Sequence, residues 1–107
     1  MMKPINVSQT GSGSTDPVPL NLNVNLFNVS MAVVVTGTVN YTVQYTLDDV
    51  WASSYNPATG TWFNHASLVT DTANETGNFA FPVAAVRLTV NSGAGTAAMT
   101  VIQAGIA

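Results

Sequence analysis

Apolar residues recur at every second position over much of the chain, which is the period of a half-buried β-strand. The clearest case spans residues 27–47, where odd positions are apolar on both sides of Thr36-Gly37-Thr38. The two apolar sets are Phe27, Val29, Met31, Val33 and Val35, then Val39, Tyr41, Val43, Tyr45 and Leu47. One strand of this length would far exceed the usual ~3–10 residues, so the chain is expected to reverse or bend sharply at the Thr-Gly-Thr segment.

The length of that turn decides which residues pair. A two-residue turn would put the two apolar sets on opposite faces, because a shift of one position reverses every side chain. A three-residue loop pairs Val35 with Val39 and Val33 with Tyr41, and it keeps one face apolar. We therefore predict a three-residue hairpin.

Shorter alternating runs predict further strands at residues 5–10, 21–26, 79–83, 86–90 and 97–103. Turn-forming or polar segments separate them, at residues 11–16, 56–60, 71–78 and 91–94. The last of these would be a hairpin loop that brings Leu88 opposite Ala97, and Pro82 confines its segment to a sheet edge or a strand end. The prediction is an all-β fold: a single antiparallel β-sandwich or jelly-roll-like domain of about six to eight short strands over residues 1–107. Residues 1–16 are alternatively an extended N-terminal arm.

Charged residues are scarce, which changes the picture of possible partners. They make up 7% of the 107 residues, against ~25% in an average domain, and the net charge is −3. The seven are Lys3, Asp16, Asp48, Asp49, Asp71, Glu75 and Arg87. Two cations cannot track a phosphate backbone or an anionic membrane, so nucleic acid and membrane are not expected partners. Weak charge repulsion between copies favours a protein that associates, and we expect a dimer or trimer.

The sequence offers little from which to build a catalytic site. It contains no cysteine, a single histidine (His65) and no nucleophile-elbow, phosphate-loop or zinc-ligand motif. We predict a non-enzymatic protein with no catalytic, cofactor-binding or metal-binding residues. A calcium site from Asp71, Asn74 and Glu75 is the minor alternative, although their spacing is not that of an EF-hand. His65 is expected at the surface or an interface, where replacement by Ala would leave folding largely unchanged.

Between residues 48 and 68 the alternation fails and aromatic residues gather. This cluster supplies the candidate interface: Trp51, Tyr55, Trp62, Phe63 and His65. Aromatic side chains on a loop serve as anchors in protein interfaces and as stacking platforms for sugar rings. The alternative is that the two tryptophans close the open end of the core.

Three segments carry a resemblance to a known class of proteins. FNVSMAVVVTGTVNYTVQYTLDD, NPATGTWFNHASL and FPVAAVRLTVNSGAGTAAMTVIQAGIA resemble small β-sandwich virion proteins of tailed bacteriophages, and capsid decoration (cement) proteins above all. The resemblance extends from about Pro4 to the C-terminus and lies in strand and turn texture, so it assigns no functional residues. It implies a structural protein on the capsid surface of the virion, bound to the lattice of the major capsid protein.

The N-terminal residues lack the apolar stretch of a signal peptide, which favours synthesis in the host bacterial cytoplasm. Three other readings stay open. They are a tail or neck accessory protein of the virion, a carbohydrate-binding β-sandwich module that uses the aromatic loop, and, as the weakest, a hydrolase.

Overall fold

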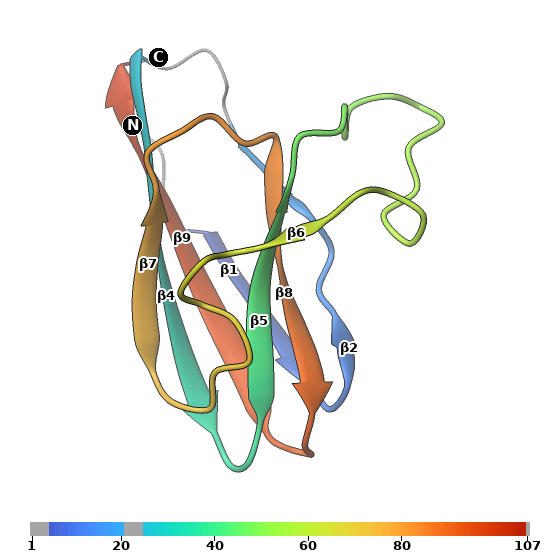
Figure 1. Ribbon diagram of the computed structural model, residues 1–107, viewed down its shortest axis with the longest axis vertical. Coiled ribbons are helices and arrows are strands. Elements are labelled where there is room, and N and C mark those ends of the chain that lie inside the picture. The colour runs from blue at the N-terminus through green and yellow to red at the C-terminus, as the bar shows by residue number, and fades with distance from the viewer. Residues whose placement is uncertain (1–4, 21–24, 107) are drawn as a thin grey trace.

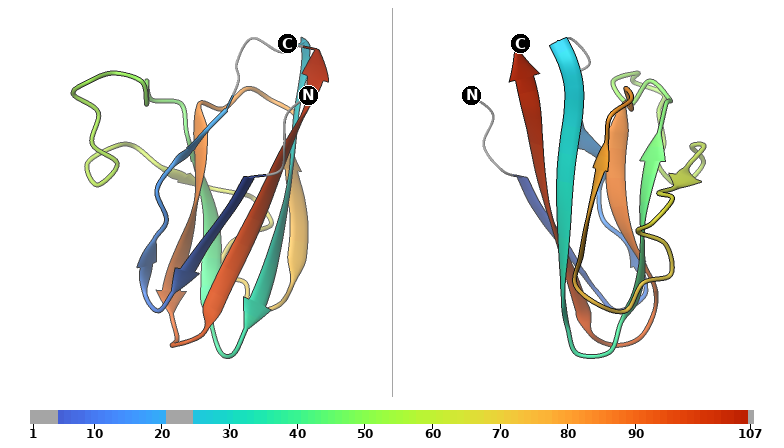
Figure 2. Two further views of the ribbon diagram at one scale, coloured as in Figure 1. Left: turned by 180° about the vertical axis from the view of Figure 1, so that it is seen from behind. Right: turned by 60° about the vertical axis from the view of Figure 1, so that its left-hand side comes forward.

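The computed structural model describes residues 5–20 and 25–106. These residues form nine strands in two antiparallel sheets that pack face to face, as the edge-on view in Figure 2 shows, and the described segments contain no helix. A helix long and apolar enough to cross a membrane is therefore not found in them. The all-β sandwich prediction is confirmed, with three of the nine strands only two residues long.

The first sheet, which we call sheet A, has the order β1-β9-β4-β7 (Figure 1). Its strands are β1 (Ile5–Thr10), β9 (Thr96–Ile106), β4 (Asn25–Thr36) and β7 (Glu75–Phe79). Since β1 pairs with β9 along all six of its residues, this part of the 1–16 segment belongs to the sandwich and does not form a separate arm. Leu22 and Val24 of the predicted 21–26 run lie outside the described residues.

Sheet B lies over sheet A and is built on two central strands, β8 (Ala85–Ser92) and β5 (Asn40–Thr46). Two short strands pair with β8 on one side, β2 (Gly13–Ser14) and β3 (Val18–Pro19). On the other side β6 (Phe63–Asn64) pairs with the end of β5. Prolines on the β2/β3 edge suit this position, because an edge strand need not donate from every backbone nitrogen.

The predicted hairpin between β4 and β5 is wrong, because the two strands lie in different sheets. Val33 pairs with Met99 of β9, and Tyr41 pairs with Val90 of β8. The bend at residues 37–39 therefore carries the chain from one sheet to the other, as seen at the bottom of Figure 1. The predicted hairpin that sets Leu88 opposite Ala97 fails in the same way, because β8 belongs to sheet B and β9 to sheet A.

The two crossings meet at the same end of the sandwich. The Gly95 N–H donates to the Thr38 carbonyl oxygen at 2.9 Å, and a Cβ on Gly95 would collide with the Thr36 carbonyl oxygen. Gly37 has a φ of 79°, which an L side chain rarely adopts. Close approach of the two loops thus requires glycine at position 95, and backbone conformation favours it at position 37.

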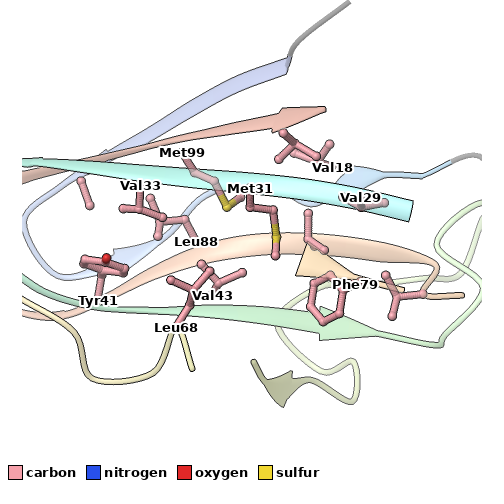
Figure 3. Close-up of a cluster of buried hydrophobic side chains, with 14 of the residues drawn as sticks. Val18, Val29, Met31, Val33, Tyr41, Val43, Leu68, Phe79, Leu88 and Met99 are labelled. Atoms are coloured by element: carbon pink, nitrogen blue, oxygen red, sulfur yellow. The ribbon is translucent and has the colours of Figure 1, made fainter. Parts of the chain in front are cut away.

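The core lies between the sheets and confirms the inward direction of the odd apolar positions from Val29 to Tyr45, whereas the side chain of Phe27 lies outside the described ones. Figure 3 shows Met31 and Val33 of β4 pointing toward the layer of β5 that carries Tyr41 and Val43, and all four side chains are buried. Two expectations fail at strand ends. Leu47 is 64% exposed because β5 ends at Thr46, and the supposed polar loop at 71–78 contains strand β7.

Candidate interaction surface

Aromatic rings gather at the end of the sandwich where β5 and β7 finish. The Tyr45 ring lies 5.0 Å from that of Phe79, 5.7 Å from that of Phe81 and 5.8 Å from that of Phe63, between ring centroids. Phe79 is buried, whereas Phe63 is 49% and Phe81 is 50% exposed. The inner rings hold the outer two in place, so the exposed rings are supported by packing.

Two more large apolar side chains lie exposed just beyond β5. Leu47 and Trp51 line a hollow of about 210 Å³ together with Asp48, Asp49, Val50 and Ala84, and Trp51 is 76% exposed. Trp51 lies in a tight turn. Its backbone N–H donates to Asp49 Oδ1 at 3.1 Å, and the Ala52 N–H donates to the Asp49 carbonyl oxygen at 3.2 Å. We call Leu47, Trp51, Phe63 and Phe81 the apolar end.

Trp62, by contrast, lies on the outer face of sheet B. Its ring faces the Arg87 guanidinium, whose carbon is 4.2 Å from the ring centroid, and its Nε1–H donates to the Pro57 carbonyl oxygen at 3.0 Å. Arg87 also donates to Gln44 Oε1 at 2.9 Å. Trp62 therefore fastens the long loop between β5 and β6 onto the sheet, and burial lowers the pKa of Arg87.

Tyr55 lies within the same loop. Its hydroxyl oxygen is enclosed and has no hydrogen-bond partner of good geometry among the described residues. Burial, followed by the nearby Asp48 carboxylate, raises the pKa of Tyr55. The neutral phenol is thus the form that this loop holds, and the ring fills space inside the loop.

His65 is buried, so the expectation that it lies at the surface is wrong. Its Nδ1 accepts hydrogen bonds from the N–H groups of Ser67 at 3.0 Å and Leu68 at 3.1 Å. Because Nδ1 is an acceptor, the proton is on Nε2, which donates to the Asn78 carbonyl oxygen at 3.1 Å. His65 joins the segment after β6 to β7 across the side of the sandwich.

The residues of the alternative calcium site act in local structure. Asp71 Oδ1 accepts from the N–H groups of Thr72 and Ala73, and Asn74 Oδ1 accepts from the Val35 N–H at 2.8 Å. Within residues 5–20 and 25–106, no group of three His, Cys, Asp or Glu side chains is placed to hold a metal ion.

The five predicted interface residues thus separate into three groups. Trp51 and Phe63 belong to the apolar end, Tyr55 and Trp62 are half-buried in the loop against sheet B, and His65 is a packing residue. Sequence reasoning missed Leu47 and Phe81, although each had a signal. Leu47 directly precedes the Asp48-Asp49 pair, and Phe81 directly precedes Pro82, a residue type that is confined to sheet edges and strand ends.

Together these features define an antiparallel β-sandwich that exposes large apolar side chains at one end. The chain matches no family model, no curated protein and no solved structure.

Proposed function

We propose that this chain is a non-enzymatic structural component of a virion, a capsid decoration protein that docks on the lattice of the major capsid protein. The apolar end carries the proposal. Leu47, Trp51, Phe63 and Phe81 are between 49% and 76% exposed, whereas a chain that works alone gains from burying such side chains.

The residue types at the apolar end are those that anchor protein interfaces. Aromatic side chains dominate binding energy where a partner covers them, because each removes ~150–250 Å² of surface from water. Phe63 and Phe81 are held by Tyr45, so little side-chain entropy is lost when they bind. The resemblance to phage decoration proteins supports a capsid lattice as the partner.

The scarcity of charge predicts how such docking responds to salt. Seven charged residues in 107 leave little scope for electrostatic steering or interfacial ion pairs. Apolar contacts and hydrogen bonds would supply the affinity, and several contacts on a repeating lattice raise weak binding by ~10²–10⁴-fold. Binding is therefore expected to persist at ~1 M salt, where interactions between exposed charges are screened beyond ~3 Å.

The test is to strip the protein from phage particles and restore it at low and at ~1 M salt. We expect equal occupancy of the particles at both salt concentrations, together with recovered heat resistance. Trp51→Ala should lower the affinity at least ~10-fold, because it removes an aromatic anchor. Ser54→Ala, an exposed change in the same loop, is the matched control and should bind as the wild type does. Loss of binding in salt, or full binding by Trp51→Ala, would refute this mode of docking, and a protein found only on tails would favour the accessory role.

A carbohydrate-binding module is the second candidate, and one feature favours it. Trp51 shares its hollow with Asp48 and Asp49, so an apolar ring lies beside carboxylate oxygens that accept hydrogen bonds. One of these oxygens, Asp48 Oδ2, already accepts from the Thr61 N–H at 2.8 Å. Quenching of Trp51 fluorescence by host cell-wall glycans, with no binding to particles, would support this candidate over capsid decoration.

A further inference from the structure

The outer face of sheet A is a second surface that lacks a partner. Even-numbered residues of β1, β4, β7 and β9 point outward, and each one whose side chain is described is Asn, Ser, Thr, Ala, Val or Ile. None of these outward residues carries a charge, although the whole chain has a net charge of −3. The carboxylate of Glu75, on the edge strand β7, lies beside Val34 at the margin of this face.

This face carries both a protrusion and a hollow. Val34 is 54% and Ile102 is 45% exposed, which is unusual for aliphatic side chains on a sheet otherwise covered by Ser, Thr and Asn. Beside Ile102 lies an open hollow of about 470 Å³, with Ser30 and Ala32 of β4 on its floor and Thr76 and Asn78 of β7 on its far wall. The small side chains on β4 leave this space open.

We propose that the outer face of sheet A binds the same face of a second copy of this chain. A two-fold dimer sets each residue of one copy against the same patch of the other, so a charged face would oppose like charges. A face without charge meets itself without that cost, and the described outward residues of this face carry no charge although the whole chain is acidic. A two-fold arrangement also allows Ile102 of each copy to enter the hollow of its partner.

The size and hydrogen-bonding character of the face fit this occupant. The four strands have 6, 11, 12 and 5 residues and lie ~4.8 Å apart, so the face covers roughly 540 Å². This is below the ~800 Å² that each partner buries in a standard interface and is typical of a weak dimer. Hydroxyl groups dominate its polar part, and a hydroxyl both donates and accepts. The Thr10 and Thr96 hydroxyls, 2.8 Å apart, already pair in this way within one copy. A hydroxyl-rich surface can therefore form hydrogen bonds with an identical surface, because each hydroxyl can act as donor or as acceptor.

The test is sedimentation equilibrium of the purified chain from low to high micromolar concentration, without particles, so that it is independent of the proposed function. We expect the wild type to form a dimer. Ile102→Glu should raise the dimer dissociation constant roughly 100-fold or more, because each dimer would then bury two unpaired carboxylates. Ile102→Thr, which keeps the β-branched shape and loses apolar contact, should weaken association less.

Leu47→Glu is the matched control, because it adds the same charge at an exposed leucine of the apolar end. It should dimerise as the wild type does, and circular dichroism should show that all variants fold. A wild type that stays monomeric, or an Ile102→Glu variant that dimerises normally, would overturn the proposal. Selective loss of the dimer in Leu47→Glu would also overturn it, because the contact would then lie at the apolar end.

Discussion

The outer faces of the two sheets are built from similar residue types, yet the outer face of sheet B is partly covered by loop residues and the outer face of sheet A is exposed. On sheet B, Thr, Gln, Asn and Arg87 are linked to one another. The loop between β5 and β6 covers Arg87, and Thr70, between β6 and β7, donates to Thr42. On sheet A, Ser, Thr, Asn and Ala lie open, with Val34 and Ile102 exposed among them. The difference comes from one cation and from the two segments on either side of β6, because the alternation along the strands is the same.

Gln44 is the centre of the covered face. Its Oε1 accepts from Arg87 Nε at 2.9 Å and from the Thr89 hydroxyl at 3.1 Å, and its Nε2 donates to Asn64 Oδ1 at 3.0 Å. Thr46, on the same strand, is fully buried and donates to the Thr61 carbonyl oxygen at 2.7 Å. Neutral polar residues therefore have two uses in this protein: on sheet B they hold a loop in place, and on sheet A they form a free surface.

The largest effect on stability is expected at His65, in the segment that packs along the β5 edge of sheet B. His65→Ala removes the acceptor for two backbone N–H groups, Ser67 and Leu68, and leaves a cavity beside Phe79. We expect a loss of about 2–4 kcal/mol in unfolding free energy, measured by urea denaturation. From the sequence alone, His65→Ala is expected to leave folding largely unchanged, and the burial of His65 reverses that prediction. Ala66→Ser is the control and should cost less than about 0.5 kcal/mol, since the side chain of Ala66 is exposed. Similar losses for both variants would show that the histidine bonds contribute little.

Next in size is the removal of the cation that holds the loop on sheet B. Arg87→Ala should cost about 1–3 kcal/mol, because it deletes the contact with Trp62 and a charge-assisted hydrogen bond to Gln44. Arg87→Lys keeps the charge without the planar group and should recover only part of the loss. Trp62 fluorescence should shift toward the spectrum of an exposed indole in the alanine variant. An unchanged spectrum would mean that the loop is held by other contacts.

A smaller, pH-dependent effect is expected from Tyr41, which joins β5 to the segment before β7. Its hydroxyl donates to the Ala73 carbonyl oxygen at 2.6 Å, and burial, with Asp71 and Glu75 nearby, raises its pKa from 10.0 to about 12. The folded state thus favours the neutral phenol. Stability from this group is fully present below pH 10 and is lost as the pH rises from 10.0 to about 12.

Tyr41→Phe tests this, because it should cost about 1 kcal/mol at neutral pH and make the unfolding free energy less sensitive to alkaline pH. Urea denaturation of both proteins across the alkaline range makes the comparison. A parallel decline in the two proteins would show that Tyr41 does not cause the loss.

The smallest effect is expected on the open face. Ser30→Ala, at an exposed outward position of β4, should change the unfolding free energy of the dilute protein by less than about 0.5 kcal/mol. Thr46→Ala, on the covered sheet, should cost about 1–2 kcal/mol, because its hydroxyl is buried and bonded. Equal costs at the two positions would remove the distinction between the faces.

The alternation predicted which side chains face inward, and it could not predict which strands pair. Val33 and Tyr41 point into the core as expected, because the period of two is set by each strand alone. A hairpin within one sheet and a bend between two sheets bury the same odd positions. The choice between them depends on the contact of Gly95 with the 36–38 bend, and these residues are far apart in the sequence.

The candidate site was predictable only in part, for a related reason. Trp51 and Trp62 have the same residue type and lie in the same loop, yet one is 76% exposed and the other faces Arg87, which comes from a distant strand. His65 likewise depends on a loop geometry that presents two N–H groups to its ring. Residue type suggested an interface, and three-dimensional neighbours decided which side chains remain free for it.

Hydroxyl-radical footprinting can test both proposed contact surfaces at once, by comparing the dilute free protein with the protein assembled on particles. We expect labelling to fall at Ile102 on sheet A and at Trp51 in the apolar end, which are exposed in the single chain. Labelling at Trp62 should stay unchanged, because Arg87 and the loop already cover it. Unchanged labelling at both Ile102 and Trp51, with new protection at Thr59 and its exposed neighbours over sheet B, would contradict the account.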